Sequence, residues 1–393
     1  MAALLGGALA GNAAAAAPTE TVLYSFDTIG GGFPGGDLLL QGSGTLIGTA
    51  SGLGSNASPY GQVFMLKSSG KGWTFKRLHA FDGQDGATPM RGLTAGATGS
   101  FYGTTSEGGA SNKGTVFELT KGAQGWTETV LADLQAKDAT PEGRLLLYKS
   151  ALYGTTVGGN GSAFKLVADG RNWKSTILET FSGDDGKNPL GGLIRDPRTG
   201  VFYGTTEMGG VNACGNVFAL AKPGGKWKET TLYSFRCGKD GADPESSLVE
   251  DSSGALYGTT YYGGNLGAGH ANSGAGTVFK LGRKTGKWTE TVLYSFVGND
   301  GEFPEDADGL LLGKDGALYG TTSEGGEYDR GIAFRLTIAG GAPQETVLHS
   351  FGAYGDGEYP EGGVIQDAKS GTLYGTTFSG GAYGYGAVWK IVP

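Results

Sequence analysis

The residues able to do acid–base or metal chemistry are few and scattered in this sequence. Only three histidines occur, His79, His270 and His349. His79 and His349 stand where similar segments carry Tyr233 or Tyr294, so we interpret them as packing or surface residues. No histidine cluster has metal-ligand spacing, and no serine–histidine–aspartate arrangement can be picked out. Carboxylates are plentiful, but no pair is marked as the acid and base of a glycosidase. The sequence therefore predicts no metal ligands and leaves any catalytic residue unassigned.

Aspartates recur three or four residues before a proline in six segments of the chain. These aspartates are Asp85, Asp138, Asp185, Asp240, Asp300 and Asp356, and the prolines of all seven segments are Pro34, Pro89, Pro141, Pro189, Pro244, Pro304 and Pro360. A ring of such carboxylates could bind Ca²⁺ through oxygen ligands. Aspartate, glycine and proline are also ordinary turn residues, and recurrence in nearly every segment favours that interpretation. We therefore predict no cofactor, with Ca²⁺ as the alternative.

The segments that position these residues are tandem repeats. The phrase Leu-Tyr-Gly-Thr-Thr at 256–260 returns, with small changes, in six other places. Its glycine falls at 48, 103, 154, 204, 258, 320 and 375, which are separated by 50 to 62 residues. A period of this length indicates a repeat architecture rather than two or three independent domains. We treat residues 18–393 as one repeat domain.

Each repeat carries four strand-like phrases rich in β-branched and aromatic residues, as half-buried strands are. In one unit they are Ser247–Val249, Leu256–Thr260, Gly276–Leu281 and Glu290–Phe296. Glycine supplies 78 of the 393 residues, which disfavours helices and marks turns. Four antiparallel strands in each of seven units predict an all-β fold, a seven-bladed β-propeller.

Each end of the chain holds a strand-like phrase that lacks its partner strand within the repeat. Glu20–Phe26 is a fourth strand with no blade of its own, and Gly386–Ile391 is a third strand with no fourth. We expect the N-terminal strand to complete the C-terminal blade, residues 361–391, because this pairing closes the ring and removes an open edge. Tryptophans at a regular offset before the fourth strand are interpreted as structural. They are Trp73, Trp126, Trp173, Trp227 and Trp288.

Aromatic side chains gather in the loops of units five, six, seven and one, on the face that also carries the proline loops. The residues predicted to bind a ligand are Tyr261, Tyr262, Tyr328, Tyr383 and Tyr385, with Glu327 and Asp329 as polar partners. Further aromatics on this face are Phe33, Tyr60, Phe303, Tyr354, Tyr359 and Phe378. Rings beside carboxylates suit sugars, which stack on one side and hydrogen-bond at the rim. Loop-against-loop packing is the alternative explanation.

The chain has two cysteines, Cys214 and Cys237, in loops of the same unit and on the same face. In a secreted protein such a pair is a disulfide candidate. Closing a loop of about 23 residues would stabilise the fold by roughly 3 kcal/mol.

These phrases in order, Leu-Tyr-Gly-Thr-Thr, Gly-Gly, Gly-Thr-Val-Phe-Lys-Leu and Glu-Thr-Val-Leu-Tyr-Ser-Phe, resemble the GloVer tandem repeat of secreted bacterial choice-of-anchor proteins. The resemblance covers residues 20–393. It implies an extracellular bacterial repeat protein, and it brings no established activity with it.

The composition of the chain restricts the classes of partner that it can bind. The formal net charge is −8 and there is no basic run, so nucleic acid is a poor candidate. No apolar stretch reaches the roughly 18 residues of a membrane span. Residues 1–17 combine a short apolar run with an alanine tract, which predicts a signal peptide, with a disordered tail as the alternative.

The sequence therefore predicts a secreted or cell-surface protein whose partner is an extracellular glycan or another cell-surface component. A non-catalytic binding or adhesion protein is the first hypothesis. A secreted polysaccharide hydrolase or lyase that uses carboxylates on the same face is the second, and a purely structural cell-surface repeat protein is the third.

Overall fold

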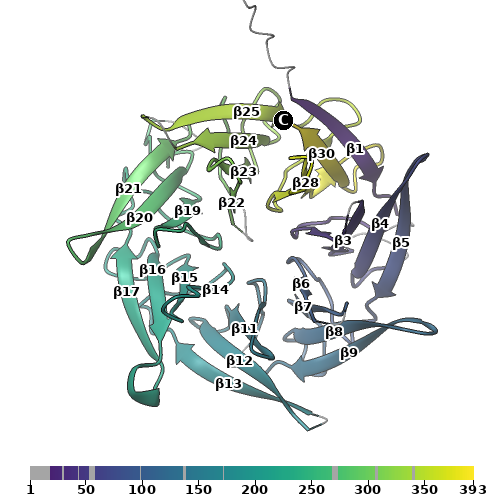
Figure 1. Ribbon diagram of the computed structural model, residues 1–393, viewed down its shortest axis with the longest axis horizontal. Coiled ribbons are helices and arrows are strands. Elements are labelled where there is room, and N and C mark those ends of the chain that lie inside the picture. Colours follow the sequence, from purple (N-terminus) through teal and green to yellow (C-terminus); the bar gives the residue numbers. More distant parts are fainter. Residues whose placement is uncertain are drawn as a thin grey trace, which may run out of the picture.

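The computed structural model describes residues 18–28, 31–42, 44–52, 58–97, 99–135, 139–170, 172–267, 273–305, 309–338 and 341–393. The predicted signal peptide at residues 1–17, and His270 and Asp138, lie outside these ranges. The described chain forms seven four-stranded antiparallel sheets arranged as blades around a ring (Figure 1). This confirms the predicted all-β propeller.

The first four blades have their shortest strand innermost and their longest strands toward the rim. Blade 1 holds β2 (Leu39–Leu40), β3 (Thr45–Ala50), β4 (Gln62–Ser69) and β5 (Gly72–Ala80). Blade 2 holds β6 (Thr94–Ala95), β7 (Phe101–Thr105), β8 (Thr115–Gly122) and β9 (Gly125–Asp133). Blade 3 holds β10 (Leu146–Tyr148), β11 (Ala151–Thr156), β12 (Ser162–Asp169) and β13 (Asn172–Thr180). Blade 4 holds β14 (Ile194–Arg195), β15 (Phe202–Thr206), β16 (Asn216–Ala221) and β17 (Lys228–Ser234), with a 3₁₀ turn η1 (Pro223–Gly225) between the last two.

The remaining three blades repeat this order. Blade 5 holds β18 (Val249–Glu250), β19 (Leu256–Thr260), β20 (Thr277–Lys284) and β21 (Lys287–Ser295). Blade 6 holds β22 (Leu311–Leu312), β23 (Leu318–Thr322), β24 (Ile332–Thr337) and β25 (Gln344–Ser350). Blade 7 holds β27 (Ile365–Gln366), β28 (Leu373–Thr377), β30 (Ala387–Val392) and β1 (Thr19–Ser25), and a small sheet of β26 (Gly357–Glu358) and β29 (Ser379–Gly380) lies in its loops.

The N-terminal strand closes the ring as predicted. β1 pairs antiparallel with β30, and Figure 1 shows the purple first strand beside the yellow last one. The following Phe26 is fully buried and packs edge-on against Phe64 of blade 1, while Tyr24 stacks on Phe75 of the same blade at 4.7 Å. The strand therefore joins the two chain ends and also covers apolar surface of the neighbouring blade.

The glycine of the repeated phrase is required by close packing inside each blade. A Cβ atom on Gly258 would lie 2.7 Å from Cζ of Phe279 and 2.9 Å from Cδ2 of Leu248. In blade 7 a Cβ on Gly375 would lie 2.2 Å from Trp389, which stands in the place of the phenylalanine. The repeat therefore keeps a large aromatic ring against a bare backbone, and the ring fills the core of the blade.

The first threonine of the phrase links neighbouring blades. Thr205 Oγ1 of blade 4 donates to the carbonyl oxygen of Ser246 in blade 5 at 2.7 Å, and Thr376 of blade 7 donates to Gly36 of blade 1 at 3.3 Å. Both threonines are buried, so each hydroxyl needs this partner. These bonds hold the short innermost strands in place around the channel.

The regularly spaced tryptophans pack as predicted. They are half-buried on the hairpin between the third and fourth strands. Trp288 lies edge-on to Tyr203 of the preceding blade at 6.0 Å, and Trp173 lies in the same way to Tyr102 at 6.4 Å. No helix among the described residues is long and apolar enough to cross a membrane.

Candidate functional site

Two sets of loops meet on one face of each blade. The loop that enters the first strand pairs with the loop between the second and third strands through short bridges. Examples are Ala87 with Glu107, Ala242 with Tyr262, and Glu302 with Glu324. The proline loops and the Gly-Gly loops therefore form one shared surface around the mouth of the channel, which we call the loop face.

The residue before each proline adopts a left-handed backbone conformation in all seven blades. The φ angles are 60° at Phe33, 58° at Thr88 and Thr140, 54° at Asn188, 56° at Asp243, and 55° at Phe303 and Tyr359. None of the seven is glycine, and non-glycine residues adopt this conformation rarely. The repeat therefore builds a ring of seven strained positions on the loop face.

Backbone hydrogen bonds explain why the strained conformation is kept. The N–H of Asp243 donates to the carbonyl of Cys214 in the preceding blade at 3.2 Å. The Asp243 carbonyl in turn accepts the N–H of Tyr261, the first residue after β19, at 3.0 Å. The same two bonds occur at the six other pre-proline residues. Each strained residue thus connects two blades and fixes the direction of its own side chain.

The side chains at these equivalent positions differ around the ring. Blades 6, 7 and 1 carry Phe303, Tyr359 and Phe33, and blades 2 to 5 carry short polar residues. Asparagine and aspartate tolerate the left-handed conformation best, whereas a bulky aromatic residue and a β-branched threonine are both outliers there. Since small polar residues make the same backbone hydrogen bonds in four blades, these links between blades do not require aromatic side chains.

Aromatic residues from neighbouring blades pack onto two of these rings. Tyr261 of blade 5 stacks on Phe303 of blade 6, with ring centres 4.8 Å apart and planes within 10°. Phe378 of blade 7 contacts Phe33 of blade 1 at 5.1 Å. We call Tyr261, Phe303, Tyr359, Phe378 and Phe33 the aromatic arc.

We call the opposite pre-proline residues the polar arc. They are Thr88, Thr140, Asn188 and Asp243.

A pocket opens at one end of the aromatic arc, between blades 5 and 6. Its volume is about 470 Å³. Its lining consists of Tyr261, Tyr262, Ser273, Phe303, Glu324, Asp329, Arg330 and Tyr359. The Arg330 guanidinium lies over the Tyr359 ring at 5.0 Å and hydrogen-bonds to its hydroxyl. Rings thus form one wall of the pocket, and charged groups form its edge.

The predicted ligand-binding residues separate into three groups in the structure. Tyr261, Tyr262 and Asp329 line the pocket. Glu327 and Tyr328 are exposed on the loop that also carries Asp329. An Asp329 carboxylate oxygen accepts the N–H of Gly325 at 3.2 Å, so this residue also holds the loop in shape.

The two predicted tyrosines of blade 7 lie elsewhere. Tyr383 is 62% exposed and is not part of the pocket lining. Tyr385 is half-buried and packs against Phe33 at 5.6 Å and against the core shared with blade 1. Tyr385 therefore supports the aromatic arc from below, whereas Tyr383 stands apart from it.

A set of glutamates follows the prolines and lies inside the arcs. Glu245, Glu305 and Glu361 are partly buried at equivalent positions of blades 5, 6 and 7. Burial, reinforced by the neighbouring Glu305 carboxylate, raises the pKa of Glu245 and of Glu361 to about 8. The positive charge of Arg91 opposes the shift at all three glutamates.

Glu245 and Glu361 can therefore hold a proton at neutral pH and donate a hydrogen bond to a ligand. In blade 3 the equivalent Glu142 instead forms an ion pair with Arg91, at 3.2 Å. The signal in the sequence was the dipeptide Pro-Glu, which recurs at the same place in four repeats. The predicted site did not include this dipeptide, nor Arg330, which reaches the pocket only through the place of its loop in the fold.

The recurrent aspartates act in the turns between blades. The carboxylate of Asp240 accepts the hydroxyl hydrogen of Tyr233 on β17 at 2.7 Å and the N–H of Arg236 at 3.1 Å. Asp300 accepts from Tyr294 and from the N–H of Val297 in the same way. These contacts support the turn interpretation, and the calcium alternative stays a prediction.

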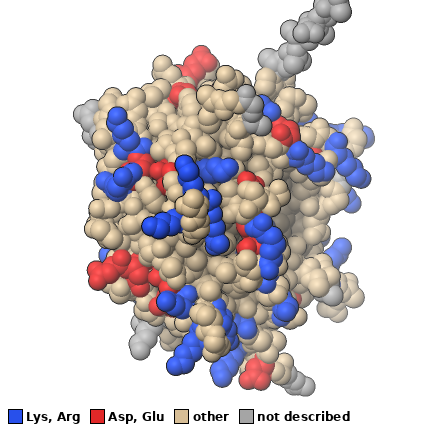
Figure 2. Space-filling model, turned by 60° about the vertical axis from the view of Figure 1, so that its left-hand side comes forward, with Lys and Arg blue, Asp and Glu red and all other residues tan. Residues whose placement is uncertain are grey.

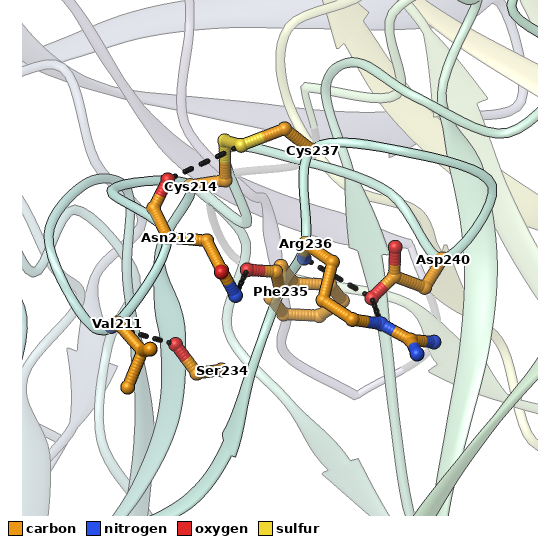
Figure 3. The surroundings of a disulfide bond; sticks show 8 residues. All are labelled: Val211, Asn212, Cys214, Ser234, Phe235, Arg236, Cys237 and Asp240. Carbon is orange, nitrogen blue, oxygen red and sulfur yellow. Dashed lines mark hydrogen bonds and ion pairs between the residues drawn. A yellow bond between two sulfur atoms is a disulfide. The ribbon is translucent and has the colours of Figure 1, made fainter.

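The predicted disulfide joins Cys214 to Cys237 in blade 4, with their Cα atoms 5.4 Å apart (Figure 3). Beside it the Asn212 side-chain amide donates to the carbonyl of Phe235 at 2.9 Å, and Arg236 pairs with Asp240 at 3.0 Å. The bridge therefore fixes the loop that contains Cys214. The carbonyl oxygen of Cys214 accepts the N–H of Asp243, one residue of the polar arc. A disulfide is compatible with an extracellular protein.

Charges of both signs cover the side of the ring that lies to the left in Figure 1. Figure 2 shows lysine and arginine side chains in small groups there, with aspartate and glutamate between them. Steering of a polyanion such as nucleic acid is favoured by a continuous basic surface, which this side lacks among the described residues.

Comparison with known proteins confirms the repeat. The Gloeobacter/Verrucomicrobia repeat model matches residues 7–163, 149–307 and 268–393, which together span nearly the whole chain. No curated protein matches the sequence.

Two solved structures share the fold at low identity. A "putative 6-phosphogluconolactonase" from Bacteroides fragilis is 15% identical, with 86% of this chain and 87% of that chain covered and a TM-score of 0.53. A protein with the same description from Bacteroides uniformis is 12% identical, with 80% and 84% covered and a TM-score of 0.52. Similarity at this level shows the propeller fold alone.

Proposed function

Because this chain belongs to the Gloeobacter/Verrucomicrobia repeat family, a family that its repeat defines, we propose a function from the geometry of the loop face. We propose that the protein is a secreted, non-catalytic binding propeller that holds an extracellular glycan on the aromatic arc. The names of the structural neighbours do not enter this proposal, because the likeness extends only to the fold.

One observation carries the proposal. Phe303, Tyr359 and Phe33 keep bulky side chains in a backbone conformation that favours glycine, asparagine and aspartate. The polar arc shows that the blades close without them. Strained residues that folding does not require are typical of functional sites, where surrounding structure holds a side chain in position for a ligand.

The chemistry of the pocket fits a sugar better than a purely apolar molecule. Tyr261 and Tyr262 offer aromatic surface, and burial raises the pKa of both hydroxyls, so they stay protonated. Glu324, Asp329 and Arg330 supply hydrogen-bond acceptors and donors at the edge. A sugar ring presents an apolar face to stack and hydroxyls to bond, which is what such a wall and edge can receive.

The pocket also limits the charge of the ligand. Two of its three charged residues are acidic, and Glu305 and Glu245 lie close enough to raise the Tyr261 pKa further. A strongly anionic polysaccharide would meet repulsion there. We therefore propose a neutral glycan as the ligand class.

A polysaccharide hydrolase or lyase is the second candidate, and a specific observation favours it. Glu245 and Glu361, with pKa values of about 8, are protonated at neutral pH and could serve as general acids. A hydrolase also needs an ionised carboxylate on the other side of the scissile bond. The third candidate is a purely structural repeat protein. It does not explain why aromatic residues with strained backbones lie on only one side of the loop face.

A glycan array followed by a turnover assay on every hit tests the proposal. We expect binding to neutral glycans and no release of new reducing ends or unsaturated products. The variant Tyr261→Ser, which copies Ser106 at the same place in blade 2, should lose binding. Tyr354→Ser is the matched control, because Tyr354 is fully exposed and outside the pocket. Turnover would establish the enzyme instead, and absence of any hit would leave the structural protein.

A further inference from the structure

At two blade interfaces a histidine, an aspartate and a glutamate come together on the outer side of the ring. His79 of β5 and Asp85 of the following loop meet Glu128 of β9. In each of the two groups the candidate ligand atoms all lie within 4.8 Å of one another, and the histidine Nε2 and aspartate Oδ2 are 2.8 Å apart at His79. Glu128 is far from His79 and Asp85 in the sequence, but the three side chains are neighbours in space.

The second group repeats the first at the interface between blades 6 and 7. His349 of β25 and Asp356 of the next loop meet Glu20 of the closing strand β1, and His349 Nε2 lies 2.7 Å from Asp356 Oδ2. The histidines are about one-fifth exposed, so an ion could reach them from solvent. The two groups are built from the same three repeat positions.

Other interfaces use tyrosine where these two use histidine. In the interface after blade 4, Tyr233 hydrogen-bonds Asp240, and Glu290 of the next blade lies beside them. Tyr294, Asp300 and Glu345 are arranged alike one blade later. A protonated phenol is a poor metal ligand, whereas imidazole is a common one. The chain thus contains both the candidate sites and their natural tyrosine counterparts.

Each glutamate of the two histidine groups has one buried carboxylate oxygen without a hydrogen-bond partner among the described residues. These atoms are Oε1 of Glu20 and Oε1 of Glu128, and the same is true of Oε1 of Glu290 and Glu345 at the tyrosine interfaces. Such a carboxylate is costly in its charged form unless a proton or a cation neutralises it. At the tyrosine interfaces only a proton can do this, but beside a histidine a metal ion can.

We propose that His79, Asp85 and Glu128, and likewise His349, Asp356 and Glu20, each bind a divalent transition-metal ion of the Zn²⁺ class. One imidazole nitrogen and two carboxylate oxygens form a three-residue set that leaves a fourth position for water. Two carboxylates also neutralise the double charge of the ion. Ligands of tetrahedral zinc stand about 3.3 Å apart for bonds near 2.0 Å, so the histidine–aspartate pair opens slightly and the glutamate moves inward.

The position of the second site gives it a structural consequence. Glu20 lies on β1, the strand that closes the ring, and His349 belongs to blade 6. A metal ion there ties the closing strand to a second blade, in addition to its pairing with β30. Because an ion that binds only the folded state stabilises it, Zn²⁺ raises the unfolding temperature through this site.

Calorimetric titration of the chelator-treated full chain with Zn²⁺ alone tests the proposal. We expect two equivalents per chain in the wild type, one in His79→Tyr or in His349→Tyr, and none in the double variant. Tyrosine is the chain's own residue at this repeat position in Tyr233 and Tyr294, so these variants are expected to fold. Glu128→Gln gives a second variant that keeps the shape of the interface and should also lose one equivalent.

Thermal unfolding with and without Zn²⁺ supplies an independent readout. The Zn²⁺-dependent rise in unfolding temperature should shrink in His349→Tyr. Absence of Zn²⁺ binding in the wild type would overturn the proposal. So would two equivalents that persist in the double variant, since the ions would then lie elsewhere.

Discussion

The aromatic arc and the polar arc share one backbone and differ in their side chains. Phe303 and Asn188 have φ angles of 55° and 54°, and both donate their N–H to the preceding blade. Asn188 also uses its side-chain amide to bond Glu207 at 3.1 Å, whereas Phe303 receives the stacked ring of Tyr261. The comparison separates what the propeller needs, a strained link between blades, from what one side adds to it, a wall of rings.

Removing the closing strand should have the largest effect, because it ends the contact between blades 7 and 1 on which the aromatic arc depends. Deletion of residues 18–27 removes the β1–β30 pairing and the buried Phe26. We expect a loss of more than about 4 kcal/mol of stability, from an uncovered core and an open edge. Chemical denaturation measures it, with a chain lacking only residues 1–17 as control. Unchanged stability would contradict the closure.

Removing the disulfide should have the next largest effect on stability, because the bridge supports a residue of the polar arc. The double variant Cys214→Ala/Cys237→Ala should lose about 3 kcal/mol of stability, the loop-entropy value for a bridge of this span. Glycan affinity should not change, since the bridge supports Asp243 rather than the rings. Denaturation with and without reductant measures the first effect. Two thiols that titrate in the unreduced, denatured wild type would show that no bridge forms.

Placing an aromatic residue in the polar arc should destabilise the protein moderately. Asn188→Phe loses the bond to Glu207 and puts a bulky side chain in the left-handed conformation. The expected loss is about 1–2 kcal/mol, which is typical of strain at one such residue. Asn188→Thr is the control, because threonine stands at the equivalent position in Thr88, whose hydroxyl also donates to a glutamate, Glu107. A neutral effect of phenylalanine would mean that the position carries no strain and would weaken the contrast between the arcs.

The glutamates between the arcs should make stability depend on pH. Burial raises the folded-state pKa of Glu361 to about 8, above its unfolded value of 4.5. The folded state therefore binds the proton more tightly, and its contribution is complete below the unfolded pKa and is lost as pH rises through about 8. Between pH 7 and pH 8, wild type should lose about 1 kcal/mol relative to Glu361→Gln. Parallel pH curves for the two proteins would contradict the assignment.

The sequence predicted those features that repeat along the chain or pair its two ends. The recurring glycines and threonines revealed the blades, and the unmatched segment Glu20–Phe26 revealed the closure. Two loops in one repeat revealed the disulfide, because repeat position defines the face on which a loop lies. In each case the relevant information was a position within the repeat.

Features that depend on contacts between repeats were harder to predict. Tyr385 reads as an exposed ring in the sequence, yet it packs under Phe33 because the ring closes there. His79 and Glu128 belong to different repeats, so no local spacing joins them. The pre-proline strain was visible only as dihedral angles, although Phe-Pro and Tyr-Pro in some repeats against Thr-Pro and Asn-Pro in others already marked the two arcs.

The most direct measurement of the central claim compares affinity and stability in one variant, Tyr359→Asn, which gives a half-buried position of the aromatic arc a residue like that of the polar arc. Calorimetry with a neutral glycan identified on the array should show affinity reduced about 30-fold or more, as expected for loss of ~2 kcal/mol at an aromatic anchor. Thermal unfolding should show equal or higher stability, because asparagine relieves the strain. Unchanged affinity together with lower stability would show that the ring serves folding rather than binding.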